Sequence, residues 1–272
     1  MIIDGRAIAA QMLAATRTRV AALGLTPVVR AITVAPNAAT ESYLSIKTVR
    51  AADAGMTLEV VRLPDGATEE EVIRAVSAPG ADAVIVQLPL PPALDTGSIL
   101  DSIPQEKDAD VLSHTARAAL ESGKNGALLP PVVAAMKELF ARTNVDAKGK
   151  KAVVVGKGWL VGEPAALWLM HRGASVSVLT RESGSLPEVL RGADIVVSGA
   201  GVAHLIKPEM LKPGVVLFDA GTSESDGTLA GDADPACAEV ASVFTPVPGG
   251  VGPIAVACLF SNVAKLLTEG SS

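Results

Sequence analysis

The stretch that decides the fold is Lys151-Ala-Val-Val-Val-Gly156-Lys157-Gly158-Trp-Leu-Val-Gly162-Glu-Pro164. It predicts a buried strand, a glycine-rich turn and then a helix, because an apolar run leads into the pattern Gly-x-Gly-x-x-x-Gly. Gly156, Gly158 and Gly162 let the backbone approach a pyrophosphate, and the amino end of the helix adds N–H donors. The spacing is one residue longer than the usual dinucleotide fingerprint. The turn therefore predicts a dinucleotide site, and the alternative is a tight connection that binds no ligand.

The end of the next predicted strand indicates which dinucleotide binds. Sites for NAD usually place an acidic residue there, about 20 residues on, to hold the ribose 2′-hydroxyl. Here the strand at residues 175–180 is followed by Arg181, whose guanidinium fits a phosphate, and Lys157 adds a second positive charge. Glu182 is the contrary signal, because a carboxylate pointing into the site favours NAD. The pattern favours NADP over NAD.

Outward from this turn, short Val/Ile-rich runs alternate with longer Ala/Leu-rich stretches of helical period. This alternation predicts an α/β fold of two doubly wound α/β domains, the second a Rossmann-type NADP-binding domain. The strand runs are almost continuously apolar, as expected when helices cover both faces of a sheet. They are residues 28–35, 57–62 and 83–87 in the first half and residues 151–156, 175–180, 193–198 and 215–219 in the second half.

Two interruptions divide the chain. Ser-Gly-Lys-Asn-Gly at residues 122–126 predicts a domain boundary, and residues 245–253 predict a second joint before a last helix over 254–267. We expect a first domain of residues 1–126 with the terminal segment 254–272, and a dinucleotide domain of residues 127–253. A ligand-binding cleft is expected between the two domains, since ligands commonly bind at domain junctions.

The composition argues against several classes of protein. The 272 residues carry a formal net charge of −6, and no run of Lys or Arg exceeds two, which argues against a nucleic-acid partner. Cys237 and Cys258 are the only cysteines, and neither they nor the three histidines show metal-ligand spacing, so no metal site is expected. No window approaches the ~20 uninterrupted apolar residues of a membrane helix. We expect a soluble, cytoplasmic protein.

Polar residues that can do chemistry stand in the first half of the chain. Tyr43 and Lys47 share one face of a helix predicted over residues 37–55, because they are four residues apart. A lysine beside an aromatic wall loses hydration, which lowers its pKa toward neutrality. Gln87 follows a buried strand directly, and Asp110 lies in the loop run Lys-Asp-Ala-Asp. Most lysines and loop acids are simply solvated, so spacing alone does not separate the two interpretations.

Taken in order, these segments resemble the bifunctional methylenetetrahydrofolate dehydrogenase/methenyltetrahydrofolate cyclohydrolase family over essentially the whole chain. The start, Ile3-Asp-Gly-Arg-Ala-Ile-Ala9, is similar to the family's amino-terminal motif. Tyr43-Leu-Ser-Ile-Lys47 fits its Tyr-x-x-x-Lys helix, and Val86-Gln-Leu-Pro-Leu-Pro91 fits a second motif. The most specific match is Thr245-Pro-Val-Pro-Gly-Gly-Val-Gly-Pro253.

The resemblance implies a folate site. Lys47 is then the catalytic lysine, Tyr43 stacks on the folate, and Gln87 holds Lys47. Asp110 is expected to hydrogen-bond the pterin, and Pro248, Gly249 and Gly250 are expected to line the folate site. The implied first reaction is oxidation of 5,10-methylenetetrahydrofolate to the methenyl form with NADP. The implied second reaction is hydrolysis to 10-formyltetrahydrofolate, with Lys47 as proton shuttle.

The resemblance also implies cofactor-contacting positions in the second domain and a homodimer formed through that domain. The expected cofactor contacts are Gly156, Lys157, Gly158, Gly162, Arg181 and Thr222.

Three departures from the family pattern bear on the second reaction and on the cofactor. Val111 stands where the family usually has Gly after the Asp-x-Asp run, and residues 128–133 differ from the family's Pro-Cys-Thr-Pro-x-Gly. Lys157 and Gly158 replace the usual Arg-Ser. The alternatives are a member with dehydrogenase activity only, a shikimate- or amino-acid-type dehydrogenase, and a non-catalytic nucleotide-sensing relative.

Overall fold

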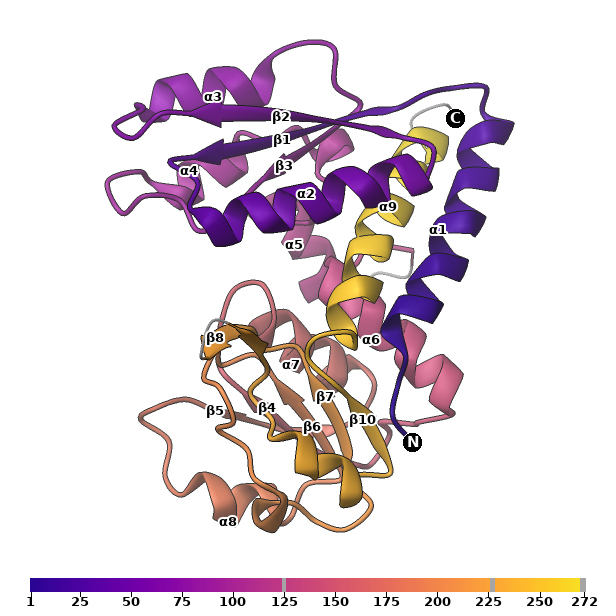
Figure 1. Cartoon of the computed structure of the whole chain (residues 1–272), viewed down its shortest axis with the longest axis vertical. Helices are drawn as coiled ribbons and strands as arrows, with labels where there is room; N and C mark the ends of the chain where they lie inside the picture. Colours follow the sequence, from indigo (N-terminus) through magenta and orange to yellow (C-terminus); the bar gives the residue numbers. More distant parts are fainter. Residues whose placement is uncertain (124–125, 226–227, 270–272) are drawn as a thin grey trace. The chain divides into compact units, whose positions relative to one another are not determined.

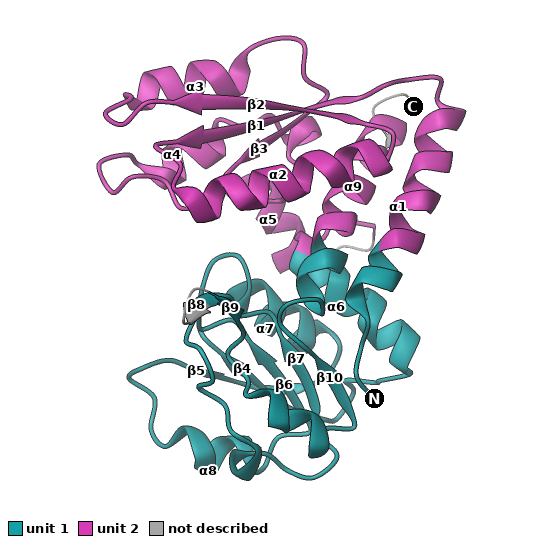
Figure 2. Cartoon of the chain, in the orientation of Figure 1, with its two compact units in different colours: residues 1–9, 132–255 teal, residues 10–131, 256–272 magenta. Residues whose placement is uncertain are grey.

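The computed structural model describes residues 1–123, 126–225 and 228–269. The chain forms two compact units, which Figure 2 distinguishes by colour. Unit 1 comprises residues 1–9 and 132–255, and unit 2 comprises residues 10–131 and 256–272. The predicted division differs from these units mainly in residues 1–9. The predicted boundary at 122–126 includes residues 124–125, which lie outside the described residues.

Figure 1 labels most of the helices and strands along the chain. The α-helices are α1 (Gly5–Ala22), α2 (Ala38–Asp53), α3 (Glu69–Ser77), α4 (Thr96–Asp101), α5 (His114–Glu121), α6 (Pro131–Thr143), α7 (Gly162–His171), α8 (Leu186–Leu190) and α9 (Val251–Glu269). Short 3₁₀ helices are η1 (Gln105–Lys107), η2 (Pro208–Met210) and η3 (Pro235–Glu239). The strands are β1 (Val28–Val34), β2 (Thr57–Leu63), β3 (Ala83–Val86), β4 (Lys151–Val155), β5 (Ser175–Leu179), β6 (Ile195–Ser198), β7 (Val216–Asp219), β8 (Ser223–Ser225), β9 (Thr228–Ala230) and β10 (Val243–Thr245).

Unit 2 is built on a parallel sheet of order β2-β1-β3. The chain leaves β1 for β2 and then returns across β1 to β3. Right-handed crossovers therefore place α2 and α3 on opposite faces of the sheet, as Figure 1 shows. The order of strands reverses between β1 and β3, and open α/β sheets bind ligands at the carboxyl ends of strands at such a point.

The sequence itself marks where two helices of unit 2 begin. The side chain of Asn37 accepts a hydrogen bond from the N–H of Thr40 and caps α2. The predicted capping box is confirmed: the Thr68 hydroxyl accepts from the Glu71 N–H at 3.3 Å, and the Glu71 carboxylate accepts from the Thr68 N–H at 2.8 Å. These caps fix the first turns of α2 and α3.

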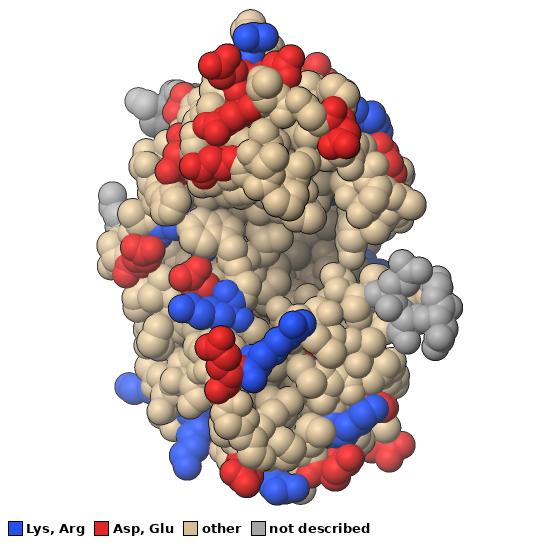
Figure 3. Space-filling model, turned by 90° about the vertical axis from the view of Figure 1, so that its left-hand side faces the viewer, with Lys and Arg blue, Asp and Glu red and all other residues tan. Residues whose placement is uncertain are grey.

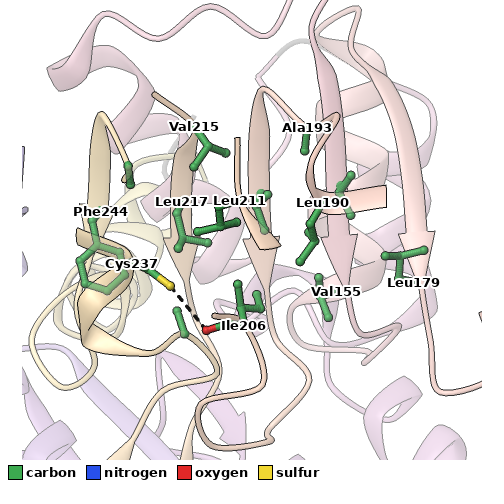
Figure 4. Close-up of a cluster of buried hydrophobic side chains, with 14 residues drawn as sticks. Val155, Leu179, Leu190, Ala193, Ile206, Leu211, Val215, Leu217, Cys237 and Phe244 are labelled. Atoms are coloured by element: carbon green, nitrogen blue, oxygen red, sulfur yellow. Dashed lines mark hydrogen bonds between the residues drawn. The ribbon is translucent and has the colours of Figure 1, made fainter. Parts of the chain in front are cut away.

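Unit 1 contains a parallel sheet of order β10-β7-β6-β4-β5, in which the strand order reverses between β4 and β6. One face of this sheet is covered by aliphatic side chains from the strands and from the segments around η2 and η3 (Figure 4). The thiol of Cys237 lies in this core and donates to the Ile206 carbonyl at 3.5 Å. A separate contact packs the Phe140 ring edge-on against Trp168, with centroids 5.0 Å apart.

The first residues of the chain pair with the β10 edge of unit 1. The Ile3 N–H donates to the Phe244 carbonyl and the Phe244 N–H donates to the Met1 carbonyl, both at 2.9 Å. The Gly5 N–H donates to the Gly249 carbonyl at 2.8 Å. The Gly5–Gly249 bond joins the Ile3–Ala9 motif to the Thr245–Pro253 motif, and the three bonds together explain why residues 1–9 belong to unit 1.

All seven predicted strands are present, with ends that differ by at most two residues. The expectation that helices cover every strand on both faces was wrong for β2 and β5. Both are edge strands, and about half of their residues or more keep exposed surface. The short strands β8, β9 and β10 were not predicted, because three-residue runs carry too little periodicity.

One described helix, α9, is long and apolar enough to satisfy a simple test for a membrane span, with a mean hydropathy of 1.6 over Val251–Thr268. Half of that window is buried within the structure. Ile254, Ala257, Phe260 and Val263 are each fully buried, as expected for a core helix.

Candidate active site

The polar residues predicted in unit 2 meet at the point where the sheet reverses its strand order. α2 follows β1 and carries Lys47, and Gln87 follows β3 directly. The Lys47 ammonium donates to Gln87 Oε1 at 2.9 Å. Gln87 Nε2 donates to the Leu88 carbonyl at 2.9 Å, which fixes the amide so that its oxygen faces the lysine. The contact joins two residues that are 40 positions apart in the sequence.

Burial perturbs the two ionisable groups at this site in opposite directions. The pKa of Lys47 is lowered because its ammonium is desolvated, and the negative charge of Asp110 offsets only part of that effect. The pKa of Asp110 is raised by burial, an effect that Lys47 opposes and Asp108 reinforces. A lysine with a lowered pKa can release and recover a proton at neutral pH, which an ordinary surface lysine does not do.

The loop that carries Asp110 is held by a buried acid. The carboxylate of Asp108 accepts from the N–H groups of Leu112 and Ser113, at 3.0 and 2.9 Å, and from the Ser113 hydroxyl at 2.7 Å. Val111, inside this turn, has a φ of 56° and is fully buried. The backbone thus adopts the left-handed conformation that favours glycine, at a strain cost of roughly 1–2 kcal/mol for a valine.

A second support for this loop comes from α9. The side-chain amide of Asn262 donates to the carbonyls of Ala109, at 3.0 Å, and Leu129, at 2.9 Å. Asn262 is 1% exposed, so both bonds are shielded from water. It joins the backbone beside Asp110 to the 128–133 segment, one of the places where the chain departs from the family pattern. No pattern of residue types predicted this contact, because Asn262 lies in an apolar helix far along the chain.

Tyr43 lies one helical turn before Lys47 on α2, and 38% of its surface is exposed. Its ring is therefore available to a planar ligand on the lysine side of the helix. Of the residues predicted for the folate site in unit 2, the structure brings Lys47, Gln87 and Asp110 together and places Tyr43 on the same helix as Lys47. Their roles toward a substrate stay predictions.

The glycine-rich turn after β4 is shaped by close backbone approaches. A Cβ on Gly156, whose φ is 97°, would lie 2.7 Å from the Gly199 carbonyl oxygen in the loop after β6. A Cβ on Gly162 would overlap the Gly156 carbonyl, and one on Gly199 would overlap the Val161 side chain. Only glycine fits these three positions, so the turn and the 199–202 loop are packed against each other at the strand reversal between β4 and β6.

The same turn leaves room and donors for an anion. Within the described part of the chain, no atom lies within 4 Å of where a Cβ on Gly158 would sit, and Lys157 is exposed. Val161, the cap residue at the amino end of α7, makes no side-chain cap hydrogen bond. That end offers N–H groups and the positive end of the helix dipole, which a pyrophosphate can use. The residues present therefore fit a dinucleotide.

Arg181 is the residue that the sequence predicts to discriminate the ribose of a dinucleotide. It follows β5 in a tight turn, in which the Ser183 hydroxyl accepts from the Thr180 N–H at 2.9 Å. Arg181 and Glu182 are both exposed at this turn. Thr222, the other predicted cofactor contact, is exposed between β7 and β8.

The Pro248–Gly250 turn follows β10 and packs on the start of α1. A Cβ on Gly5 would overlap the Gly250 carbonyl, and a Cβ on Gly250 would lie 2.6 Å from the Pro246 carbonyl oxygen. The peptide between Val247 and Pro248 is cis. The structure places this turn in unit 1, and its contact with a folate stays a prediction.

The sequence analysis missed two buried acids near the glycine turn, Asp219 and Asp232. Asp219 ends a predicted strand, which is the only available signal for either acid. Among residues 1–123, 126–225 and 228–269, no three His, Cys, Asp or Glu side chains are grouped so as to hold a metal ion.

Comparison with known proteins agrees with both halves of this arrangement. Residues 3–110 match the catalytic-domain model of the tetrahydrofolate dehydrogenase/cyclohydrolase family, and residues 130–270 match the model of its NAD(P)-binding domain. The bifunctional protein FolD of Thermus thermophilus is 35% identical over 278 residues, covering 100% of this chain and 98% of its own.

Solved structures agree over the full length. The bifunctional enzyme FolD from Campylobacter jejuni has a TM-score of 0.94 at 29% identity and covers 99% of both chains. The Trypanosoma brucei FolD, solved with NADP cofactor and an inhibitor, has a TM-score of 0.93 at 32% identity and covers 100% of this chain and 98% of its own. Two family models and a full-length relative thus coincide, and the chain belongs to the tetrahydrofolate dehydrogenase/cyclohydrolase family.

Proposed function

We propose that Lys47 is the proton shuttle of this enzyme, with Gln87 as the residue that orients it and Asp110 as a ligand of the pterin. The enzyme itself is an NADP-dependent methylenetetrahydrofolate dehydrogenase and methenyltetrahydrofolate cyclohydrolase. The observation that carries the proposal is the Lys47–Gln87 hydrogen bond at 2.9 Å, beside Asp110 and with the pKa of Lys47 lowered by burial.

In the oxidation step the protein binds and orients the substrate. NADP, when bound, accepts the hydride from the carbon that bridges N5 and N10 of the folate. Tyr43 offers its ring as a stacking surface, and Asp110 accepts hydrogen bonds from the amine-bearing heterocycle. No proton has to leave the bridging carbon in this step, so Lys47 is not needed as an acid or base for it.

The hydrolysis step needs a group that both accepts and donates a proton. Water adds to the methenyl carbon, and its proton passes to the neutral amine of Lys47. The bond from this carbon to N5 then breaks as the Lys47 ammonium returns the proton to N5, and the hydroxyl on the carbon releases its own proton to solvent to give the carbonyl of the 10-formyl product. Gln87 keeps the lysine in one orientation through both transfers.

In unit 1 we assign the cofactor to the turn after β4. Gly156, Gly158 and Gly162 let the backbone and the amino end of α7 approach the pyrophosphate, and Lys157 adds a positive charge. Arg181 pairs with the 2′-phosphate, which accounts for the use of NADP rather than NAD.

Thr222, after β7, and the Pro248–Gly250 turn complete the proposed sites, as contacts of the cofactor and of the folate respectively. Their positions after β7 and β10, at carboxyl ends of strands in the same sheet as β4, support this assignment. The proposed substrate-binding domain is residues 1–126 with 254–272, and the proposed NADP-binding domain is residues 127–253.

We also propose a cytoplasmic homodimer formed through unit 1, with no nucleic-acid or membrane partner. β5 is an edge strand whose outer backbone edge is open to pairing, and Val178 on it and Met170 on α7 are 38% and 50% exposed. On the face drawn in Figure 3, basic and acidic side chains are mixed and no large basic patch stands out, in keeping with the net charge of −6. Light scattering of the purified protein tests the dimer: a dimeric mass is expected, and a monomeric mass contradicts it.

The proposed function is tested by incubating the purified protein with 5,10-methylenetetrahydrofolate and either NADP or NAD. We expect reduction of NADP, weaker reduction of NAD, and passage of the methenyl intermediate to 10-formyltetrahydrofolate. Accumulation of the methenyl product would contradict the hydrolytic role of Lys47, and equal use of both dinucleotides would contradict the role of Arg181.

A further inference from the structure

Two acids that the proposed mechanism does not use are buried beneath the cofactor turn of unit 1. Asp219 ends β7 and Asp232 follows β9, and they are 1% and 0% exposed. Burying a carboxylate costs free energy unless the carboxylate is hydrogen-bonded. The hydrogen-bond partners of these two acids therefore indicate their role.

Asp232 binds the loop that follows β6. Its Oδ2 accepts from the Ser198 hydroxyl and from the Ala200 N–H, both at 2.6 Å, and its Oδ1 accepts from the Val202 N–H at 2.8 Å. Both oxygens thus fix the backbone of one short segment. A Cβ on Gly221 would overlap this carboxylate, so the glycine after β7 makes room for it.

The loop held by Asp232 is the one packed on the glycine-rich turn. Gly199 lies against Gly156 and Val161, and the Ala200 Cα would lie 3.1 Å from a Cβ on Gly156. Because these contacts leave no free space, a shift of the 199–202 loop displaces the turn that we assign to the pyrophosphate.

Asp219 supports the backbone segments next to Asp232. Its carboxylate accepts from the Gly221 N–H at 3.0 Å and from the Ala233 N–H at 2.8 Å. These bonds fix Gly221, at the start of the segment that leads to Thr222, and Ala233, the residue that follows Asp232. Burial, reinforced by the charge of Asp232, raises the pKa of Asp219 to about 7.

We infer that Asp232 is a positioning residue for NADP: it does not touch the cofactor, but holds the 199–202 loop against the Gly156 turn. This inference rests on the proposed assignment of that turn to the cofactor. It predicts that the charge and both acceptor oxygens of Asp232 set the affinity for the dinucleotide, whereas the hydrolysis step, which needs no hydride acceptor, depends on other residues.

The test replaces Asp232 by Asn and measures binding of NADPH by fluorescence titration. Asn keeps the shape but presents an amide NH₂ to a backbone N–H, so we expect the Kd for NADPH to rise about 10-fold or more. The KM for NADP should rise with it. Hydrolysis of methenyltetrahydrofolate without NADP, and the thermal unfolding midpoint, should fall far less than the NADPH affinity.

Two further variants sharpen the result. Asp234→Asn is the matched control, because Asp234 lies two residues on, near the surface, where it pairs with Lys207 at 2.9 Å and accepts from the Ala236 N–H at 3.0 Å. Among the residues that the structure describes, its carboxylate accepts no hydrogen bond from the loop that Asp232 holds, so the Kd of this variant should equal that of the wild type. Ser198→Ala removes one bond to Asp232 without a buried charge change, and should raise the Kd by about 2- to 5-fold, which keeps the test valid if Asp232→Asn folds poorly.

An unchanged Kd in both Asp232→Asn and Ser198→Ala overturns the inference. A parallel loss of binding, hydrolysis and folding in both variants also overturns it, since a merely structural role has that effect. If the wild-type protein itself fails to bind NADPH, the proposed assignment of the cofactor turn fails instead, which separates the two outcomes.

Discussion

Replacing Lys47 by Met separates the two reactions of this enzyme. The thioether side chain has a similar length and no proton to transfer. Proton transfer by a positioned side chain typically contributes about 10²- to 10⁴-fold, so hydrolysis of the methenyl substrate should fall by that factor. Oxidation with NADP should fall much less, because the hydride step requires no proton from Lys47. The variant should therefore accumulate the methenyl intermediate.

The stability of this variant can be worked out from the contacts of Lys47. The substitution removes one hydrogen bond to Gln87 but also removes the desolvation of a charged group. Since Gln87 is half-buried, water can reach its freed oxygen, and we expect a net loss of about 1 kcal/mol, or about 2–4 °C in Tm. A loss of hydrolysis with a Tm that falls by no more than this is then a chemical effect.

The assay follows absorbance of the methenyl compound, first supplied as substrate and then formed in the coupled reaction with NADP. Lys47→Arg is the informative second variant, because Arg keeps the positive charge beside Asp110 but does not release its proton. It should be as inactive in hydrolysis as Lys47→Met. Lys137→Met, an exposed lysine on α6, is the control and should behave as the wild type. Hydrolysis by Lys47→Met at the wild-type rate would refute the shuttle.

Four other substitutions test separate parts of the account. Gln87→Glu places a carboxylate beside Lys47, so the pKa of Lys47 should rise and the pH profile of hydrolysis should move to higher pH. An unmoved profile would contradict the contact between residues 47 and 87. Arg181→Ser should raise the KM for NADP about 10-fold or more and leave that for NAD nearly unchanged, as steady-state kinetics with each dinucleotide will show. Thr68→Ala removes the capping box and should lower the unfolding free energy by about 1 kcal/mol in a urea titration without altering either activity. Asp219 has a folded-state pKa raised from 3.8 to about 7. Between these pH values the folded state binds a proton that the unfolded state lacks, so the free energy of unfolding falls as pH rises through that window, by about 4 kcal/mol at most. Asp219→Asn should flatten this part of the curve of unfolding free energy against pH, and an unchanged slope would contradict the raised pKa.

The strands and the glycine turn could be predicted because their signals are local. An apolar run such as residues 151–155 bounded by Gly156 fixes a strand and a turn whatever lies elsewhere in the chain. The capping box at Thr68 is equally local. The edge strands β2 and β5 were predicted as strands, but not as edges, since strand order is a property of the whole sheet.

The candidate site was predicted only as separate pieces. Spacing placed Tyr43 and Lys47 on one helix face, but the contact from Lys47 to Gln87 depends on β3 returning beside β1. The resemblance to a family supplied that pairing before the structure did. Asn262 and Asp232 carried no comparable signal, because each acts on backbone groups distant in sequence, and such hydrogen bonds leave no pattern of residue types.

Val111 shows a limit of reading a motif by residue type alone. The family usually has glycine at this position, and glycine adopts a left-handed backbone without strain. Val111 has a left-handed backbone conformation, with its side chain buried. Burial of an aliphatic side chain stabilises by about 1.5–3 kcal/mol, which is enough to offset the strain of roughly 1–2 kcal/mol. The loop that carries Asp110 thus accommodates a valine in a left-handed turn.

The most direct test of the account is the pKa of Lys47 itself, measured by NMR titration of its side chain, with the signal assigned by its absence in Lys47→Arg. The account predicts a midpoint clearly below the ordinary value of about 10.4, which rises again in Gln87→Glu. A midpoint at or above the ordinary value would contradict the proposal that burial prepares Lys47 to exchange protons at neutral pH.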